Sequence, residues 1–73
     1  MNKYVLTSTV YHLKKEVVLY GIAIVCEKDG SYELINEING ISESRASVQG
    51  VVDDCNETKP LYGEFLNKID SIL

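Results

Sequence analysis

The spacing of apolar residues changes once along the chain, near residue 40. Up to Ile38, β-branched and aromatic residues stand in short runs between turn formers, a pattern that is typical of strands. After Gly40 the apolar residues recur at helical spacing. The pattern therefore predicts three strands, over residues 3–13, 16–27 and 31–38, followed by two helices.

The loop between the second and third strands decides which side chains share a face. A three-residue loop over 28–30, with its glycine in the left-handed conformation of a bulge, sets Cys26 opposite Tyr32. The alternative is a two-residue turn over 29–30, which sets Cys26 beside Glu33. Because a slip of one residue moves the apolar set to the wrong side, we favour the longer loop. It gathers one apolar face, made of Tyr20, Ile22, Ile24, Cys26, Tyr32, Leu34 and Ile38.

The second strand is apolar on its other face too. A strand of this kind is usually central and covered on both sides, whereas two helices on one side leave the other side open. An uncovered apolar patch of that size is unusual on a monomer, so this face predicts a homodimer. Pairing through the free edge of the first or third strand is an alternative route to the same stoichiometry. The candidate dimer face is Val17, Leu19, Gly21, Ala23 and Val25.

Two helices are expected after Gly40. The first has Ser42 as its N-cap and runs to Asn56, which suits a left-handed terminator. Its buried face holds Val48, Val51, Val52 and Cys55. Pro60 marks a fresh start, and the second helix covers 61–73. Its apolar side extends to the last residue, so we expect a docked C-terminus; that side is Leu61, Tyr62, Phe65, Leu66, Ile69, Ile72 and Leu73.

These elements define an α+β fold, a three-stranded antiparallel meander followed by two helices packed on one face (βββαα). The 73 residues form a single small globular domain over 1–73. A chain of this length buries only about 60% of the surface that its unfolded form exposes. We therefore expect a marginal stability, or one that a partner raises.

Charge is distributed unevenly. Eleven acidic and seven basic residues give a net charge of −4, and the acidic residues concentrate after Lys28. Such a surface repels phosphate backbones, which disfavours direct nucleic-acid binding, and it attracts a basic protein partner. An acidic inhibitor or antitoxin-like protein that occupies a basic nucleic-acid enzyme is thus the alternative function. Its candidate surface is Glu43, Asp53, Asp54, Glu57 and Glu64.

Location follows from three further features. The apolar run over 17–26 is half of what a membrane span needs, so no membrane binding is expected. The first residues lack the continuous apolar region of a signal peptide. Two cysteines are too few for the disulfide-rich secreted class. We therefore expect a cytoplasmic protein.

The search for a chemical site finds no motif. Cys26 and Cys55 are far apart without a CxxC, and both fall on faces assigned to the core, where a thiol packs as a small hydrophobe. His12 is the only histidine, the residue type that most often serves as a general base, but nothing in the sequence fixes a partner such as Ser8, Ser42, Ser44 or Ser47 beside it. The glycines form no phosphate loop. We expect no cofactor, no metal and no enzymatic activity.

Four short segments carry a family resemblance: Tyr20-Gly21-Ile22 in a central strand, "INGIS" over 38–42, a helix that closes on "VVDDCN", and a short amphipathic ending in Ile-Leu. In these the chain resembles a family of small bacterial proteins of unknown function from endospore-forming and related gut bacteria. The last helix departs from the family's pattern, which has a histidine and an acidic-aromatic ending. The resemblance implies no activity, cofactor or catalytic residue. The sequence as a whole indicates a small non-enzymatic protein-interaction or regulatory module that acts as a homodimer.

Overall fold

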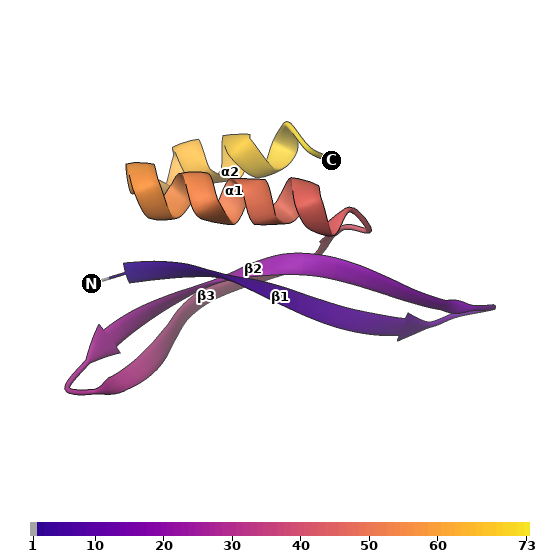
Figure 1. Cartoon of the computed structure of the whole chain (residues 1–73), viewed down its shortest axis with the longest axis horizontal. Coiled ribbons are helices and arrows are strands. Elements are labelled where there is room, and N and C mark those ends of the chain that lie inside the picture. Colours follow the sequence, from indigo (N-terminus) through magenta and orange to yellow (C-terminus); the bar gives the residue numbers. More distant parts are fainter. Residues whose placement is uncertain (1) are drawn as a thin grey trace.

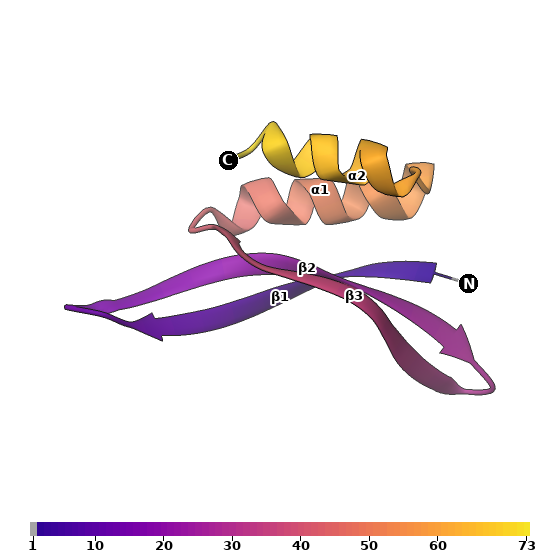
Figure 2. The same cartoon turned by 180° about the vertical axis from the view of Figure 1, so that it is seen from behind.

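A computed structural model describes residues 2–73 of the chain. The elements are β1 (Asn2–His12), β2 (Glu16–Lys28), β3 (Ser31–Ser42), α1 (Arg45–Thr58) and α2 (Tyr62–Asp70). The strands form one antiparallel sheet in the order β1-β2-β3, and Figures 1 and 2 show both helices on the same side of it. The predicted α+β class and the order βββαα are confirmed.

The sheet is longer than the helical layer above it. The longest dimension of the molecule is 43 Å, and it follows the strands. Both hairpins project beyond the helices, in opposite directions (Figures 1 and 2). The helices lie over the part of the sheet that holds the beginning of β1, so within residues 2–73 the tip of the β1–β2 hairpin has no helix on either face.

The β2–β3 turn differs from the prediction. Asp29 and Gly30 both have positive φ, 52° and 77°, which is the geometry of a two-residue type I′ hairpin turn. Cys26 consequently lies opposite Glu33. The prediction that Cys26 faces Tyr32 is therefore wrong, and the alternative register holds next to the turn.

A bulge farther along β3 then changes the register. Between Val25 and Ile24 the pairing shifts by one residue, which returns Ile38 to a position opposite Ile22 on the side of the helices. Before the bulge, Leu34 lies opposite Val25 on the other face. The predicted apolar face is therefore wrong for Tyr32 and Leu34, whereas Tyr20, Ile22, Ile24 and Ile38 do pack toward the helices.

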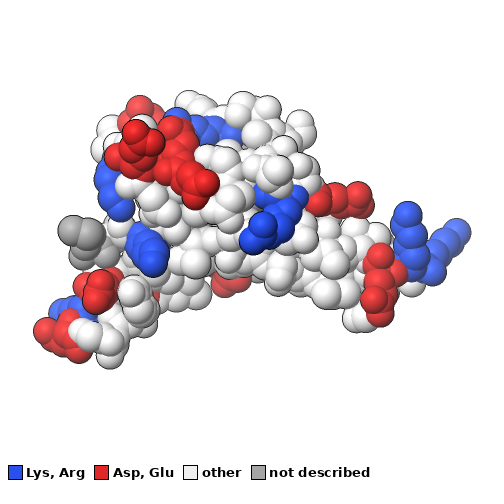
Figure 3. All heavy atoms as spheres, in the orientation of Figure 1, with Lys and Arg blue, Asp and Glu red and all other residues white. Residues whose placement is uncertain are grey.

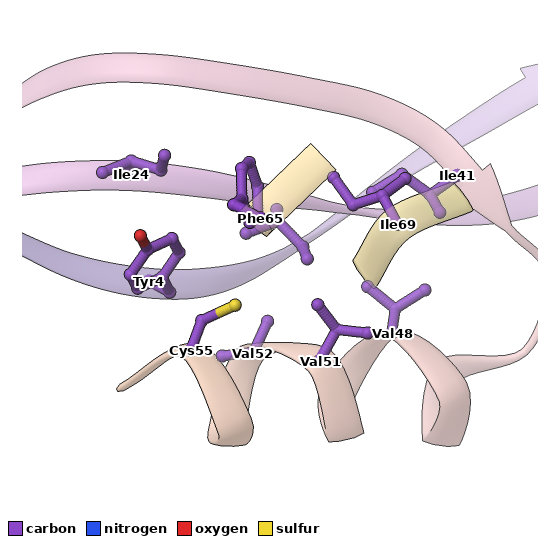
Figure 4. Packing of buried hydrophobic residues seen from close by; sticks show 10 residues of the cluster. Tyr4, Ile24, Ile41, Val48, Val51, Val52, Cys55, Phe65 and Ile69 are labelled. Atoms are coloured by element: carbon purple, nitrogen blue, oxygen red, sulfur yellow. The ribbon is translucent and has the colours of Figure 1, made fainter. Parts of the chain in front are cut away.

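The core lies between the sheet and the two helices (Figure 4). The predicted inner face of α1, made of Val48, Val51, Val52 and Cys55, is buried, which confirms that assignment. Phe65 of α2 has no exposed surface, and its ring centroid is 5.3 Å from that of Tyr4. Burial of an aromatic side chain of this size makes Phe65 the centre of the core.

The ends of α1 lie two to three residues beyond the predicted ones. The register of β3 shifts again near Gly21, so that Ser42 pairs with Tyr20 and remains in the strand. Ser44 is therefore the N-cap, and its Oγ accepts a hydrogen bond from the backbone N–H of Ser47 at 3.3 Å. Lys59, with φ 49°, takes the left-handed position that was expected of Asn56.

The second helix is shorter and less buried than predicted. It ends at Asp70, and of its seven apolar positions only Phe65 and Ile69 are buried. Ile72 packs partly against the core, but Leu73 is 76% exposed, so the expectation of a docked last residue is wrong. The reason is that α2 lies at the outside of the helical layer, so only the side of α2 that faces α1 and the sheet is buried.

Candidate functional site

The sheet face turned away from the helices is called the open face here. It carries the candidate dimer residues of β2, and the register sets beside them the odd-numbered residues of β1 and, from the first part of β3, Tyr32 and Leu34. The structure brings all five candidates onto this face, but with unequal exposure. Gly21 and Ala23 are buried, whereas Val17, Leu19 and Val25 are half-buried.

The middle of the open face is filled by the sheet itself. A Cβ on Gly21 would lie 2.3 Å from the carbonyl oxygen of Ile38, because β3 crosses close to β2 at this point. A Cβ on Gly40, whose φ is 68°, would lie 3.1 Å from the hydroxyl of Tyr11 and close to Leu19. Glycine is required at both positions for these approaches. The predicted stripe is therefore not continuous at the surface.

An apolar patch remains at one end of the open face. Leu34 is 57% exposed, Tyr32 is 60% exposed and Val5 is 37% exposed, with half-buried Val25 between them. A shallow hollow of about 290 Å³ is lined by Val5, Val25, Tyr32 and Lys3. We call Val5, Val25, Tyr32 and Leu34 the open-face patch.

The outer edge of β1 is closed over its first residues only. The side chain of Asn56 accepts a hydrogen bond from the backbone N–H of Tyr4 and donates one to its carbonyl, both at 2.8 Å. Lys59 Nζ donates to the carbonyl of Asn2 at 2.9 Å. The end of α1 therefore replaces a neighbouring strand there. The sequence gives only a weak signal for this contact, which is a polar Asn56 directly after buried Cys55.

The acidic candidates separate into two groups. Asp53, Asp54 and Glu57 lie on the second half of α1, where Figure 3 shows acidic atoms together. Glu64 lies close by in α2, and Glu43 precedes the other end of α1. The structure therefore gathers four of these residues near one end of the helical layer and leaves Glu43 apart.

Two of the gathered carboxylates already have structural contacts. Asp54 Oδ2 lies 2.5 Å from Lys68 Nζ and joins the two helices, and this hydrogen bond raises the pKa of Lys68. Glu64 accepts a hydrogen bond from the backbone N–H of Leu61 at the start of α2. Asp53 accepts only an exposed hydrogen bond from Gln49, which lies on the same helix.

The candidate catalytic side chains are not brought together. His12 is exposed, and its Nδ1 lies 3.6 Å from Glu16 Oε1 across the hairpin. Ser44 Oγ and Ser47 Oγ are hydrogen-bonded to each other at 2.9 Å in the N-cap of α1. Within residues 2–73, no group of three His, Cys, Asp or Glu side chains could hold a metal ion.

The two cysteines have different environments. Cys55 is completely buried in the core, and burial raises the pKa of its thiol, so its predicted packing role is confirmed. Cys26 faces the side of the helices but lies half-buried near the end of β2, outside the core. Its predicted place in the core is therefore wrong.

Comparison with known proteins identifies a family. The model of a family described as a family of unknown function (DUF6514) matches residues 2–59, from β1 through α1. No curated protein and no solved structure matches the chain. Over residues 2–73, neither helix has the length and apolar character needed to cross a membrane.

Proposed function

The chain belongs to the DUF6514 family of unknown function, and from its surfaces we propose that it is a non-enzymatic protein-interaction or regulatory module that acts as a homodimer. The observation that carries the interaction role is the open-face patch. Three large apolar side chains of this patch are each more than a third exposed on the face without helices. Contiguous exposed apolar surface of this kind marks interaction sites in folded proteins.

The open-face patch has the composition of a protein-binding surface. Tyr32 offers a rigid aromatic ring with a polar tip, the residue type that most often anchors an interface. Lys3 borders the hollow, and Glu27 and Glu37 lie on the same face by register. An apolar centre with a charged rim is the usual anatomy of protein–protein contacts.

A binding role fits the polar side chains better than a catalytic one. Catalysis requires a nucleophile, a base and an orienting group that converge in a cleft. His12 instead lies near the tip of a projecting hairpin with only Glu16 beside it among residues 2–73. The net charge of −4 repels phosphate groups, so the proposed partner is a protein and neither a nucleic acid nor a membrane. The proposed location is the cytoplasm, where thiols such as Cys26 and Cys55 stay reduced.

The alternative, an acidic inhibitor of a basic nucleic-acid enzyme, has less support. Asp54 is neutralised by Lys68, and Glu64 is engaged at the start of α2. Glu43 lies at the other end of α1. This leaves Asp53 and Glu57 as a small field, which is weak for steering a basic protein.

Sedimentation equilibrium of the whole chain tests the homodimer. The expected species has twice the mass of the 8.2 kDa chain. A single 8.2 kDa species at every concentration would remove the homodimer from the proposal.

Affinity capture with three forms of the chain tests the open-face patch. Wild type is compared with Leu34→Asp in the patch and with Leu61→Asp, a matched change at an exposed leucine next to α2. We expect a protein that wild type and Leu61→Asp retain and Leu34→Asp loses. Equal capture by all three forms would contradict the role of the patch.

A further inference from the structure

The two edges of the sheet are protected differently. Along β3, Glu33, Glu37 and two register shifts interrupt the edge, and charges and bulges of this kind prevent strands from pairing with other molecules. The beginning of β1 is closed by Asn56 and Lys59. Residues 6–12 of β1, the edge segment, have no such protection within the part of the chain that the structure describes.

The backbone of the edge segment is ready for pairing. Alternate residues of an antiparallel strand turn both backbone groups toward the same side. Asn56 bonds the N–H and the carbonyl of Tyr4 from outside the sheet, so these two groups point away from β2. Every second residue after Tyr4 therefore points its own N–H and carbonyl outward too; these residues are Leu6, Ser8, Val10 and His12. No side chain of residues 2–73 hydrogen-bonds to the backbone of these four. The sequence Thr7-Ser8-Thr9-Val10-Tyr11 has no charge, proline or glycine and is rich in strand-forming residues.

We infer that a second copy of this chain occupies the edge segment, with the two β1 strands antiparallel about a two-fold axis at Thr9. This inference rests on the proposed homodimer and names its interface. Thr9 is the midpoint of residues 6–12, so Ser8 meets Val10 of the second copy and Leu6 meets its His12. Every outward-turned residue then pairs with another, giving about eight backbone hydrogen bonds. An axis at Ser8 would instead set His12 against Tyr4, whose backbone groups Asn56 already holds.

The charges of the molecule are complementary in this arrangement. Antiparallel pairing brings Lys14 and Lys15, at the hairpin tip of one copy, beside residues 3 and 4 at the beginning of β1 in the other copy. Asn56 fixes the second half of α1 at that end, where exposed Asp53 and Glu57 lie together with Lys59, whose Nζ donates to the carbonyl of Asn2. Figure 3 shows the basic hairpin tip and the acidic group on the helices toward opposite ends of the molecule. The two-fold axis repeats this contact, so that each basic tip meets an acidic helix end.

The helical layer leaves room for the second copy. The helices lie over the beginning of β1 and leave the β1–β2 hairpin projecting beyond them (Figures 1 and 2). The two sheets join into one, with both helical layers on the same side. Both open-face patches then lie on the other side of the joined sheet, at opposite ends of it, and stay available to a protein partner.

A proline in the edge segment gives the sharpest test. Val10→Pro removes an outward N–H without touching a hydrogen bond to β2, and edge strands tolerate proline in this orientation. Val10→Thr is the matched control, because it keeps the N–H and the β-branched shape. In sedimentation equilibrium we expect wild type and Val10→Thr at twice 8.2 kDa and Val10→Pro at 8.2 kDa. Circular dichroism verifies that all three forms are folded.

Charge reversal tests the same interface without a backbone change. Lys14→Glu with Lys15→Glu is expected to raise the dissociation constant about tenfold, since each exposed ion pair is weak but is repeated by the symmetry. Adding Asp53→Lys and Glu57→Lys restores opposite charges and should return the constant to within about threefold of wild type. Lys28→Glu, at the other hairpin, is the control and should leave it unchanged. These variants decide the matter if Val10→Pro does not fold.

The outcomes separate this inference from the proposed function. A wild-type chain that is monomeric at every concentration overturns both. A dimer that survives Val10→Pro, or that is indifferent to reversal and restoration of the charges, overturns the edge interface alone. Dissociation by Leu34→Asp in place of Val10→Pro would assign the dimer to the open-face patch.

Discussion

The two halves of β1 pair with the same neighbour, β2, but they differ in everything else that touches them. In the first half, Tyr4 is buried beneath Phe65 and its backbone is held by Asn56. In the second half, Val10 is 48% exposed, and Figure 1 shows this end of β1 running out beyond the two helices. Strand-forming residues occur in both halves, so propensity does not explain the contrast. Cover from α1 and α2 protects one half, and the other depends on β2 and, in our account, on a second copy.

Removal of the cover should have the largest effect. Phe65→Ala deletes the side chain at the centre of the core and leaves a cavity over Tyr4, so we expect a loss of about 3–5 kcal/mol of unfolding free energy. Val10→Ala, in the uncovered half, should cost less than about 1 kcal/mol in the monomer. Urea unfolding of dilute protein measures both. Equal losses would contradict the contrast between the two halves.

Gly21 lies where the two halves of the strand meet, opposite Thr7. Gly21→Ala would place a Cβ 2.3 Å from the carbonyl oxygen of Ile38, and we expect a destabilisation of about 3 kcal/mol because backbone must move. Gly50→Ala is the control, since among residues 2–73 no atom other than those of its chain neighbours and the backbone of α1 lies within 4 Å of its added Cβ, and it should stabilise by about 1 kcal/mol. Thermal unfolding compares the two variants. A neutral Gly21→Ala would mean that β3 does not cross this closely.

Loss of the edge closure should have a smaller effect. Asn56→Ala removes both hydrogen bonds to the backbone of Tyr4, with an expected cost of about 2 kcal/mol. Asn36→Ala is matched to it, because the Asn36 side chain also makes two hydrogen bonds, to the Tyr62 hydroxyl and from the backbone N–H of Glu37, but both are exposed. Its cost should stay below about 1 kcal/mol. If the two alanine variants unfold at the same urea concentration, the amide of Asn56 does not secure the first half of β1.

The smallest expected effect is the pH dependence of the covered half. Burial raises the pKa of Cys55 above its ordinary value of 9.0, because the thiolate is disfavoured in the core. The unfolded chain therefore loses the Cys55 thiol proton at a lower pH than the folded chain does. The contribution of the buried thiol to the free energy of unfolding is complete below pH 9.0, and it decreases as the pH rises from there through the folded-state pKa. Urea unfolding at increasing pH should show this decrease, and Cys55→Ala should reduce its slope; an unchanged slope would contradict the assignment.

The helices could largely be predicted from the sequence, since the repeat of Val48, Val51, Val52 and Cys55 has one period and one apolar side. The register of β3 could not. After a two-residue turn, one bulge at any position of β3 before Ile38 brings Ile38 opposite Ile22. The apolar pattern therefore does not show where in β3 the bulge lies. Asp29 and Gly30 have positive φ and form a two-residue turn, so the bulge lies farther along β3, after Leu34. Tyr32 and Leu34 precede the bulge and therefore lie on the open face.

The candidate site could be predicted only as a face. Alternation along β2 correctly sets Val17 and Val25 on the side away from the helices. The cover over the middle of that face comes from Tyr11 and the crossing of β3, contacts between residues distant in sequence. The closure of β1 by Asn56 is of the same kind, and it determines which part of the edge is left open.

Amide hydrogen exchange along β1, followed by NMR, tests the central claim most directly. The outward N–H groups of Ser8 and Val10 should exchange slowly at concentrations where sedimentation gives the dimer, and faster on dilution. The N–H of Tyr4, which Asn56 holds within each chain, should stay protected at both concentrations. Rapid exchange at Ser8 and Val10 in a sample that is dimeric would contradict pairing through the edge of β1.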